Sequence, residues 1–375
     1  MRPKIFVLSV VLLFVAGFVM LDHHELRAGE VNPTSGYRVL DPIHHGNLTV
    51  FPVVANKNYP TGEFLTLDEG LHSGDVVVTE AGSVQGLVRR HGAPVHRYEG
   101  AEVNRLVLVN NSKRPLLLLA GEIVSGGKQD RVIGKDRIVP VGAEPLPLSV
   151  FCVEHGRWNS GSDKFAAGGT IVHPSVREKA AVDQSQAQVW AAVRGVAPMA
   201  TARPGSAART TNGAAAISRT EVDSVIASAA PTMSYRKIYE SPQLGHSVEV
   251  LANELEKRFE RATKGQEVIG AVVAFSGEIA WSDVFASSAL FKTYWPKLLR
   301  SYAVEALSRP VTRESASLDD ARDFLKPADG RIREETEPGV YRWRERTEGP
   351  AAEIEIEALQ PKPLTLHWLK VLRAS

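Results

Sequence analysis

This sequence has little cysteine and no marked excess of positive or negative charge. Its 375 residues include one cysteine, Cys152, so no disulfide can form within the chain and core packing must hold the fold together. The 44 lysine and arginine residues are nearly matched by 43 aspartate and glutamate residues, which leaves a net charge of +1. Because binding to a phosphate backbone requires an excess of basic side chains, this balance argues against a nucleic-acid partner.

The sequence also lacks the short motifs of several enzyme classes. It contains no Gly-x-Ser-x-Gly elbow and no His-Glu-x-x-His motif. Residues 121–128 resemble a phosphate-binding loop but are one residue too long, and Gln129 stands where a Mg²⁺-binding Ser or Thr is needed. His23-His24 and His44-His45 are adjacent pairs, and neighbours on a strand point to opposite faces. We therefore expect no metal site and no cofactor.

The N-terminus is typical of an export signal. Arg2 and Lys4 precede an uncharged apolar run over residues 5–21, and Asp22 begins a polar segment. A basic start followed by an apolar run predicts an export signal or N-terminal anchor over residues 1–28, and hence a periplasmic or extracellular protein. Cleavage of the signal and membrane anchoring through residues 5–21 are both compatible with this pattern.

Short apolar runs between turn residues predict strands in the first part of the chain. Residues 103–109 and 116–120 are two such runs, and the Asn-rich turn between them predicts a hairpin. Residues 161–169 are predicted to form a loop, and the Ala-, Gly- and Ser-rich residues 196–217 a flexible linker.

Helical spacing of apolar residues predicts helices over residues 174–193, 247–264 and 290–307, the last interrupted near Pro296. Residues 268–275 form a continuous apolar run that is typical of a buried strand. Strict alternation in residues 340–344 and 353–357 predicts two strands that each keep one face in water.

These elements predict an α+β fold. The β-rich N-terminal half spans residues 30–160, and a helical part with the flexible loop spans residues 174–265. An α/β part with a closing antiparallel C-terminal sheet spans residues 266–375. We expect residues 30–375 to form a single domain.

Two polar turns at strand ends are the candidate functional site, because sites are commonly built on such turns. The first, residues 121–131, follows a Leu-rich strand and carries Glu122, Lys128, Gln129 and Arg131 around a Gly pair. Glu122 is a candidate acid or base, Lys128 and Arg131 are candidates for holding an anion, and Gln129 is a further ligand-binding candidate. A structural hairpin with solvated charges is the alternative.

The second polar turn follows Cys152. Glu154 is a candidate acid or base, Arg157 a candidate anion ligand and Trp158 a stacking surface. Cys152 itself ends an apolar run, which is typical of a small buried core residue. Asp283 lies after the strand 268–275, and we attribute it to the acidic N-terminus of a helix.

The chain resembles the ARG and Rhodanese-Phosphatase-superfamily-associated protein family. Residues 121–122, 126–131, 152–158 and 188–190 carry the resemblance, and residues 270–275, 283–285 and 297–302 extend it. The family's name records association with ADP-ribosylglycohydrolases and phosphatases, which implies a role in ADP-ribose or nucleotide metabolism. The resemblance supplies no catalytic residues.

Two functions follow as hypotheses. The first is an exported domain that binds, or binds and hydrolyses, a small anionic ligand of the ADP-ribose or nucleotide type. The second is a non-catalytic exported binding or scaffold module whose polar turns form a structural ion-pair network. An open pocket shared by the two turns would favour the first, and buried ion pairs at Glu122 would favour the second. The sequence alone does not decide whether the protein is an enzyme.

Overall fold

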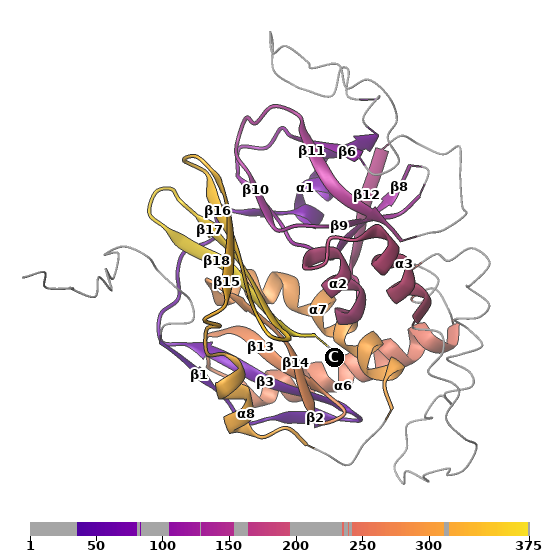
Figure 1. Ribbon diagram of the computed structural model, residues 1–375, viewed down its shortest axis with the longest axis vertical. Coiled ribbons are helices and arrows are strands. Elements are labelled where there is room, and N and C mark those ends of the chain that lie inside the picture. Colours follow the sequence, from indigo (N-terminus) through magenta and orange to yellow (C-terminus); the bar gives the residue numbers. More distant parts are fainter. Residues whose placement is uncertain are drawn as a thin grey trace, which may run out of the picture.

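A large antiparallel sheet and a small closed barrel make up the fold (Figure 1). The computed structural model describes residues 36–80, 83, 105–127, 129–153, 164–195, 235, 239, 242–310 and 315–373, and structural statements concern these residues. The predicted signal at residues 1–28 and the predicted linker at residues 196–217 lie outside them. In the described part, no helix is long and apolar enough to cross a membrane.

The large sheet has nine strands and runs in the order β1-β3-β13-β14-β18-β17-β16-β15, with β2 paired to β3. Its strands are β1 (Tyr37–Val39), β2 (Ile43–His45), β3 (Leu48–Ala55), β13 (Val268–Phe275), β14 (Glu278–Phe285), β15 (Arg331–Glu337), β16 (Tyr341–Glu348), β17 (Ala351–Ala358) and β18 (Leu364–Leu372). The sheet therefore joins the start of the described chain to its end.

The barrel closes in the order β11-β6-β5-β12-β8-β9, and a separate three-stranded sheet has the order β10-β7-β4. The barrel strands are β5 (Val76–Glu80), β6 (Arg105–Asn110), β8 (Glu122–Gly126), β9 (Arg131–Ile133), β11 (Leu146–Cys152) and β12 (Lys164–Ile171). The small sheet contains β4 (Leu65–Thr66), β7 (Leu116–Leu118) and β10 (Arg137–Val139).

Helices cover both faces of the large sheet. The helices of the described residues are α1 (Leu67–Ser73), α2 (Pro174–Ala181), α3 (Gln186–Gly195), α6 (Pro242–Ala262), α7 (Ser288–Ser308) and α8 (Leu318–Phe324). Of these, α1 packs on strands of the barrel and the small sheet, and α3 packs on β11. Ala271 and Val273 of β13 share a core with α6 and α7, whereas Val272 and Ala274 share one with α8. Because strand side chains alternate between faces, α8 lies on the face opposite α6 and α7.

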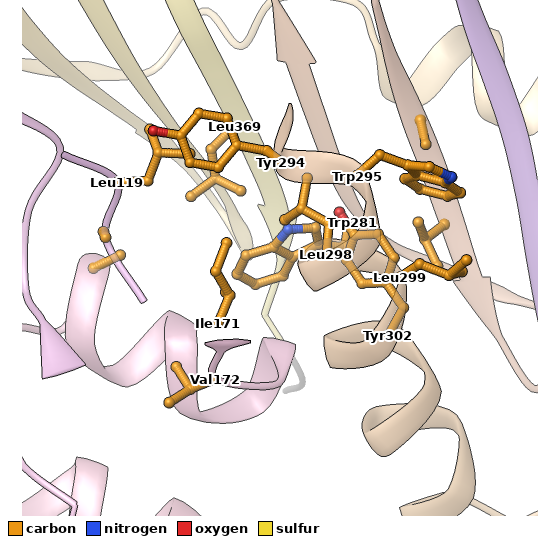
Figure 2. Close-up of a cluster of buried hydrophobic side chains, with 14 of the residues drawn as sticks. Leu119, Ile171, Val172, Trp281, Tyr294, Trp295, Leu298, Leu299, Tyr302 and Leu369 are labelled. Atoms are coloured by element: carbon orange, nitrogen blue, oxygen red, sulfur yellow. The ribbon is translucent and has the colours of Figure 1, made fainter. Parts of the chain in front are cut away.

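One core runs without interruption from the sheet to the barrel. Figure 2 shows Trp281 of β14 and Leu369 of β18 beside side chains of α7, with Leu119 and Ile171 on the barrel side. This shared core fixes the barrel against the sheet, and therefore positions the polar turns relative to the C-terminal half.

The structure confirms the α+β class and several predicted elements. The helix predicted over residues 247–264 is α6, and the strand predicted over residues 268–275 is β13. The interruption predicted near Pro296 is wrong, because α7 runs through it. Trp295 and Leu298, on either side of Pro296, are buried in the core, and this packing outweighs the roughly 3 kcal/mol cost of an internal proline.

Three further predictions are wrong. The helix predicted over residues 174–193 is split into α2 and α3, and Gln184 between them has a positive φ of 48°. Residues 164–169, predicted as loop, belong to β12, which pairs with β5 and β8. The strands β6 and β7 form no hairpin, because β6 joins the barrel and β7 joins β10 and β4.

The wet face predicted for residues 353–357 is also wrong. Glu353 and Glu357 of β17 are buried to 1% and 0% exposure. Arg344 of β16 lies opposite Glu355 and donates to Glu357 at 3.1 Å, and the backbone N–H of Ala328, after α8, donates to Glu353 at 2.7 Å. Alternation correctly predicted two faces, but cross-strand arginines and the end of α8 cover the polar one.

Candidate functional site

The strands that flank both predicted polar turns end at the same end of the barrel. At this end β8 stops at Gly126 and β9 starts at Arg131, while β11 stops at Cys152 and β12 starts at Lys164. The register places Arg131 opposite Cys152, and Phe165 of β12 opposite Gly126. Closure of the barrel thus brings together strand ends that are separate along the sequence.

Close contact with β12 requires the glycine pair of the first turn. Gly126 and Gly127 have φ values of 140° and 54°, which disfavour residues with a side chain. A Cβ atom at Gly126 would lie 2.6 Å from the carbonyl oxygen of Lys164, and one at Gly127 would lie 2.4 Å from the ring of Phe165. The pair is therefore needed for packing, whatever else the turn does.

Gln129 and Arg131 lie buried at this end of the barrel, with 6% and 1% exposure. Nη1 of Arg131 donates to Oε1 of Gln129 and to the carbonyl oxygen of Asp130, each at 3.3 Å. The turn is also tied internally, because the N–H of Gly126 donates to Oδ1 of Asp130 at 3.2 Å. These hydrogen bonds hold the guanidinium of Arg131 in place beneath the turn.

Cys152 is buried, with 1% exposure, which confirms the core residue predicted from the apolar run. Its backbone is held by Gln186 of α3, whose side chain accepts from the N–H at 2.8 Å and donates to the carbonyl at 2.9 Å. These two hydrogen bonds attach α3 to the edge of the second turn.

Glu122 lies at the start of β8, away from the turn itself, and its carboxylate is enclosed. It is 1% exposed; Oε1 contacts Nζ of Lys297 at 2.5 Å and Oε2 accepts the N–H of Leu119 at 2.8 Å. Lys297 of α7 also contacts Oδ2 of Asp68 at 2.8 Å and lies 4.6 Å from the ring centroid of Tyr294. The pair joins the barrel to α7.

The pKa values of both partners lie above their ordinary values, for different reasons. Burial raises the pKa of Glu122, against the opposing effect of Lys297. Burial lowers the pKa of Lys297, but the carboxylates of Glu122 and Asp68 outweigh burial and leave it above its ordinary value. Lys297 is therefore charged throughout the neutral range, and its loss would leave Glu122 as an uncompensated buried carboxylate.

The structure adds a second buried cluster, centred on Asp283. Nη1 of Arg177 donates to both Asp283 oxygens at 2.8 and 2.9 Å, and Nε1 of Trp281 donates to Oδ2 at 2.8 Å. Nε2 of His367 lies 2.9 Å from Oδ1, and the hydroxyl of Tyr302 also donates to the carboxylate. Asp283 lies within β14 and not at a helix N-terminus, so the role predicted for it is wrong.

This cluster reaches the loop before β8. Nδ1 of His367 lies 2.6 Å from Oδ2 of Asp136, whose Oδ1 accepts the N–H of Ala120 at 2.7 Å. Nε of Arg177 donates to the carbonyl of Ala120 at 2.7 Å. Asp136 and Arg177 therefore hold the backbone of Ala120, and His367 and Asp283 are the charged partners of those two side chains.

Charge pairing sets the protonation of this cluster. Burial would raise the pKa of Asp283, but Arg177 and then His367 outweigh it and lower that pKa well below its ordinary value. Burial would lower the pKa of His367, but Asp136 and Asp283 outweigh it and raise that pKa. With His367 protonated, its two N–H groups donate to two carboxylates and the four charges cancel.

In the described residues, the Asp283 cluster borders a groove through Trp281, whereas no residue of the Glu122–Lys297 network lines either of the two main grooves. The larger groove, with a cavity volume of about 640 Å³, is lined by Trp281, Arg309 and Arg373 among others, and the smaller by Arg137 and Tyr341. Glu122, Arg131 and Asp283 line neither of them. In the described ranges no group of three or more His, Cys, Asp and Glu side chains is arranged to hold a metal ion.

The sequence indicates part of this arrangement. Gln129 and Arg131, both predicted, lie at the first turn, whereas Glu122 lies at the other end of β8 and pairs with Lys297. The sequence did not indicate Lys297 as the partner of Glu122, or Arg177 and His367 as partners of Asp283, because no local pattern links residues so far apart along the chain. Lys128, Glu154, Arg157 and Trp158 lie outside the described residues, so their predicted roles stay predictions.

Comparison with known proteins gives one relationship. No curated protein and no solved structure matches the chain. The model of the ARG and Rhodanese-Phosphatase-superfamily-associated Protein domain matches residues 36–369, which include every strand and helix named above except the end of β18. Because this match covers most of the chain, the protein belongs to the ARG and Rhodanese-Phosphatase-superfamily-associated Protein domain family.

Proposed function

We propose that this protein binds a small anionic ligand at the end of the barrel that carries the two polar turns, and that Glu122 serves the fold instead of a reaction. The convergence of the flanking strand ends carries the proposal, since the strands that lead into both turns end side by side. The name of the family is in keeping with a binding or hydrolytic role.

The charge beneath the first turn supports an anion as the ligand. Arg131 is held by Gln129 and by the carbonyl of Asp130, so its positive charge is fixed before a ligand arrives. Because Arg131 is buried, it acts as a charge below the ligand, and we assign direct contacts to Lys128, Arg157 and Trp158. A phosphate-bearing ligand such as ADP-ribose or a nucleotide satisfies an arginine, a lysine and a stacking indole.

Hydrolysis is not assigned to Glu122. A general acid or base must come within about 3 Å of the proton it transfers. Both oxygens of Glu122 are already engaged, one by Lys297 and one by the N–H of Leu119. Of the two carboxylates predicted as acid or base, Glu154 is the one that we retain for any hydrolytic step.

A ligand screen tests this function. A compound that binds only the folded protein raises the unfolding temperature, by an amount that corresponds to about 2.7 kcal/mol at 100 times its Kd. We expect ADP-ribose, a nucleotide or a sugar phosphate to raise it, and Arg157→Ala or Lys128→Ala to abolish that shift. Arg322→Ala, on the exposed surface of α8, is the matched control and should leave the shift intact.

The outcomes separate the hypotheses. Conversion of the bound compound that is lost in Glu154→Gln while the thermal shift remains would show hydrolysis at this site. A shift without conversion would indicate a binding domain. No shift with any compound would refute the anion site and favour a non-catalytic scaffold module.

We also propose that residues 1–28 direct the protein out of the cytoplasm. The basic start and the apolar run over residues 5–21 support this. Fractionation of a Gram-negative host that expresses the full chain, followed by N-terminal sequencing, tests it. Recovery of the intact chain from the cytoplasm alone would contradict it.

A further inference from the structure

We infer that the outer edge of β15 is a docking surface for a second copy of this chain, which adds its own β15 in antiparallel orientation. The strand Arg331–Glu337 is the last in the order of the large sheet and pairs only with β16 among the described strands. All seven of its residues are exposed, including Ile332 at 57%. An uncovered strand edge presents unpaired backbone donors and acceptors that another strand can use.

The order of charges along β15 selects the partner. The strand reads Arg-Ile-Arg-Glu-Glu-Thr-Glu, with its positive charges first and its negative charges last. In an antiparallel pair centred on Glu334, Arg331 of each copy faces Glu337 of the other, and Arg333 faces Glu335. A parallel pair in register would place like charges opposite each other, which is destabilising.

The faces of the sheet fix this register. When two copies form one continuous sheet about a twofold axis perpendicular to it, the same face of each β15 lies on the same side. A register shift of one residue would exchange the faces, so the allowed registers differ from one another by two residues. The centred register is the one that overlaps all seven residues. Shifting it toward either end would place Arg333 opposite Arg333, or Glu335 opposite Glu335.

One pair of like charges remains at the centre, and the chain already compensates for it. The two Glu334 side chains meet at the twofold axis. Within each copy, Nε of Arg342 and Nε of Arg344 lie 3.5 and 3.6 Å from the Glu334 carboxylate. Four guanidinium groups therefore surround the two central carboxylates in the pair.

Charge reversal at the strand ends tests the inference. In the described part of the chain, the side chains of Arg331 and Glu337 make no hydrogen bond or ion pair of their own, so changing them leaves the fold intact. Sedimentation velocity over a range of concentrations should show a reversible dimer of the wild-type chain that added salt weakens. Arg331→Glu and Glu337→Arg should each weaken self-association roughly tenfold, since each turns two opposite-charge pairs into like-charge pairs.

The double variant R331E/E337R decides the question, because it restores opposite charges across the interface and should recover wild-type association. Lys264→Glu, an exposed reversal away from β15, is the matched control and should have no effect. A wild-type chain that stays monomeric at every concentration would overturn the inference. So would a dimer that both single reversals leave unchanged, or one that the double variant fails to restore.

Discussion

Replacing Lys297 with methionine should destabilise the protein strongly, because it removes the cation that compensates a buried carboxylate. Lys297 and Glu122 have side-chain exposures of 6% and 2%, and their charged atoms are 2.5 Å apart. Methionine keeps most of the apolar stem of the lysine in the core. The main change is therefore the unpaired charge of Glu122.

The expected loss in the free energy of unfolding is about 3–5 kcal/mol, the usual cost of removing one partner of a buried ion pair. Asp68→Ala should cost much less, roughly 0.2–1 kcal/mol, because the Asp68 side chain is 36% exposed and solvent screens its pairing with Lys297. In the double variant E122Q/K297M neither charge of this buried pair remains. We expect most of the lost stability to return, and the two substitutions to be strongly non-additive.

Chemical unfolding, followed by tryptophan fluorescence and by circular dichroism, measures these changes, and coincident curves would support a single transition. The pH dependence provides a second test. Without Lys297, the folded-state pKa of Glu122 rises further above its unfolded value of about 4.3. The Lys297→Met variant should therefore keep its stability below the unfolded-state pKa of Glu122 and lose stability as the pH rises through the folded-state pKa. Its loss in the free energy of unfolding relative to wild type should be larger at pH 8 than at pH 5.

The double variant should lack this pH-dependent deficit. Equal losses for Lys297→Met and Asp68→Ala, with a double variant that simply adds the single effects, would refute the reasoning. That result would mean that Glu122 is hydrated, and it would reopen its assignment as an acid or base.

Three other substitutions test separate features. Asp283→Asn should cost about 3–5 kcal/mol in chemical unfolding, because it leaves the buried Arg177 guanidinium without its counter-ion; a loss below 1 kcal/mol would contradict the closed network. Burial lowers the pKa of His173. Its contribution to the free energy of unfolding should therefore be complete above about pH 6.5 and be lost as the pH falls toward the folded-state pKa. His173→Gln should remove this pH dependence of stability between about pH 5 and 7, and an unchanged dependence would exclude His173 as its source. Gly127→Ala should lower the unfolding temperature more than Gly339→Ala. Both glycines have a positive φ, but of the two only at Gly127 would an added Cβ atom meet neighbouring atoms. Equal effects would show that backbone strain alone sets the loss of stability.

The sequence by itself determined the local elements of this protein. Apolar residues at helical spacing predicted α6, and Gly265 beyond it has the positive φ of 76° expected of a glycine after a helix end. The continuous apolar run of β13 and the buried Cys152 were equally visible. These features depend on neighbours within a few residues, so a single sequence carries them, and the motifs around the polar turns were enough to indicate the family.

Tertiary structure alone decided which charges meet. Glu122 and Lys297 are 175 residues apart in sequence, and His367 and Asp136 are 231 apart. Closure of the barrel and its packing on the large sheet bring them together, and the same packing buries a glutamate face that alternation had predicted to be wet. Strand register across sheets leaves no periodic signal along the chain, and so the partner of a buried charge can be known only once the strands are placed.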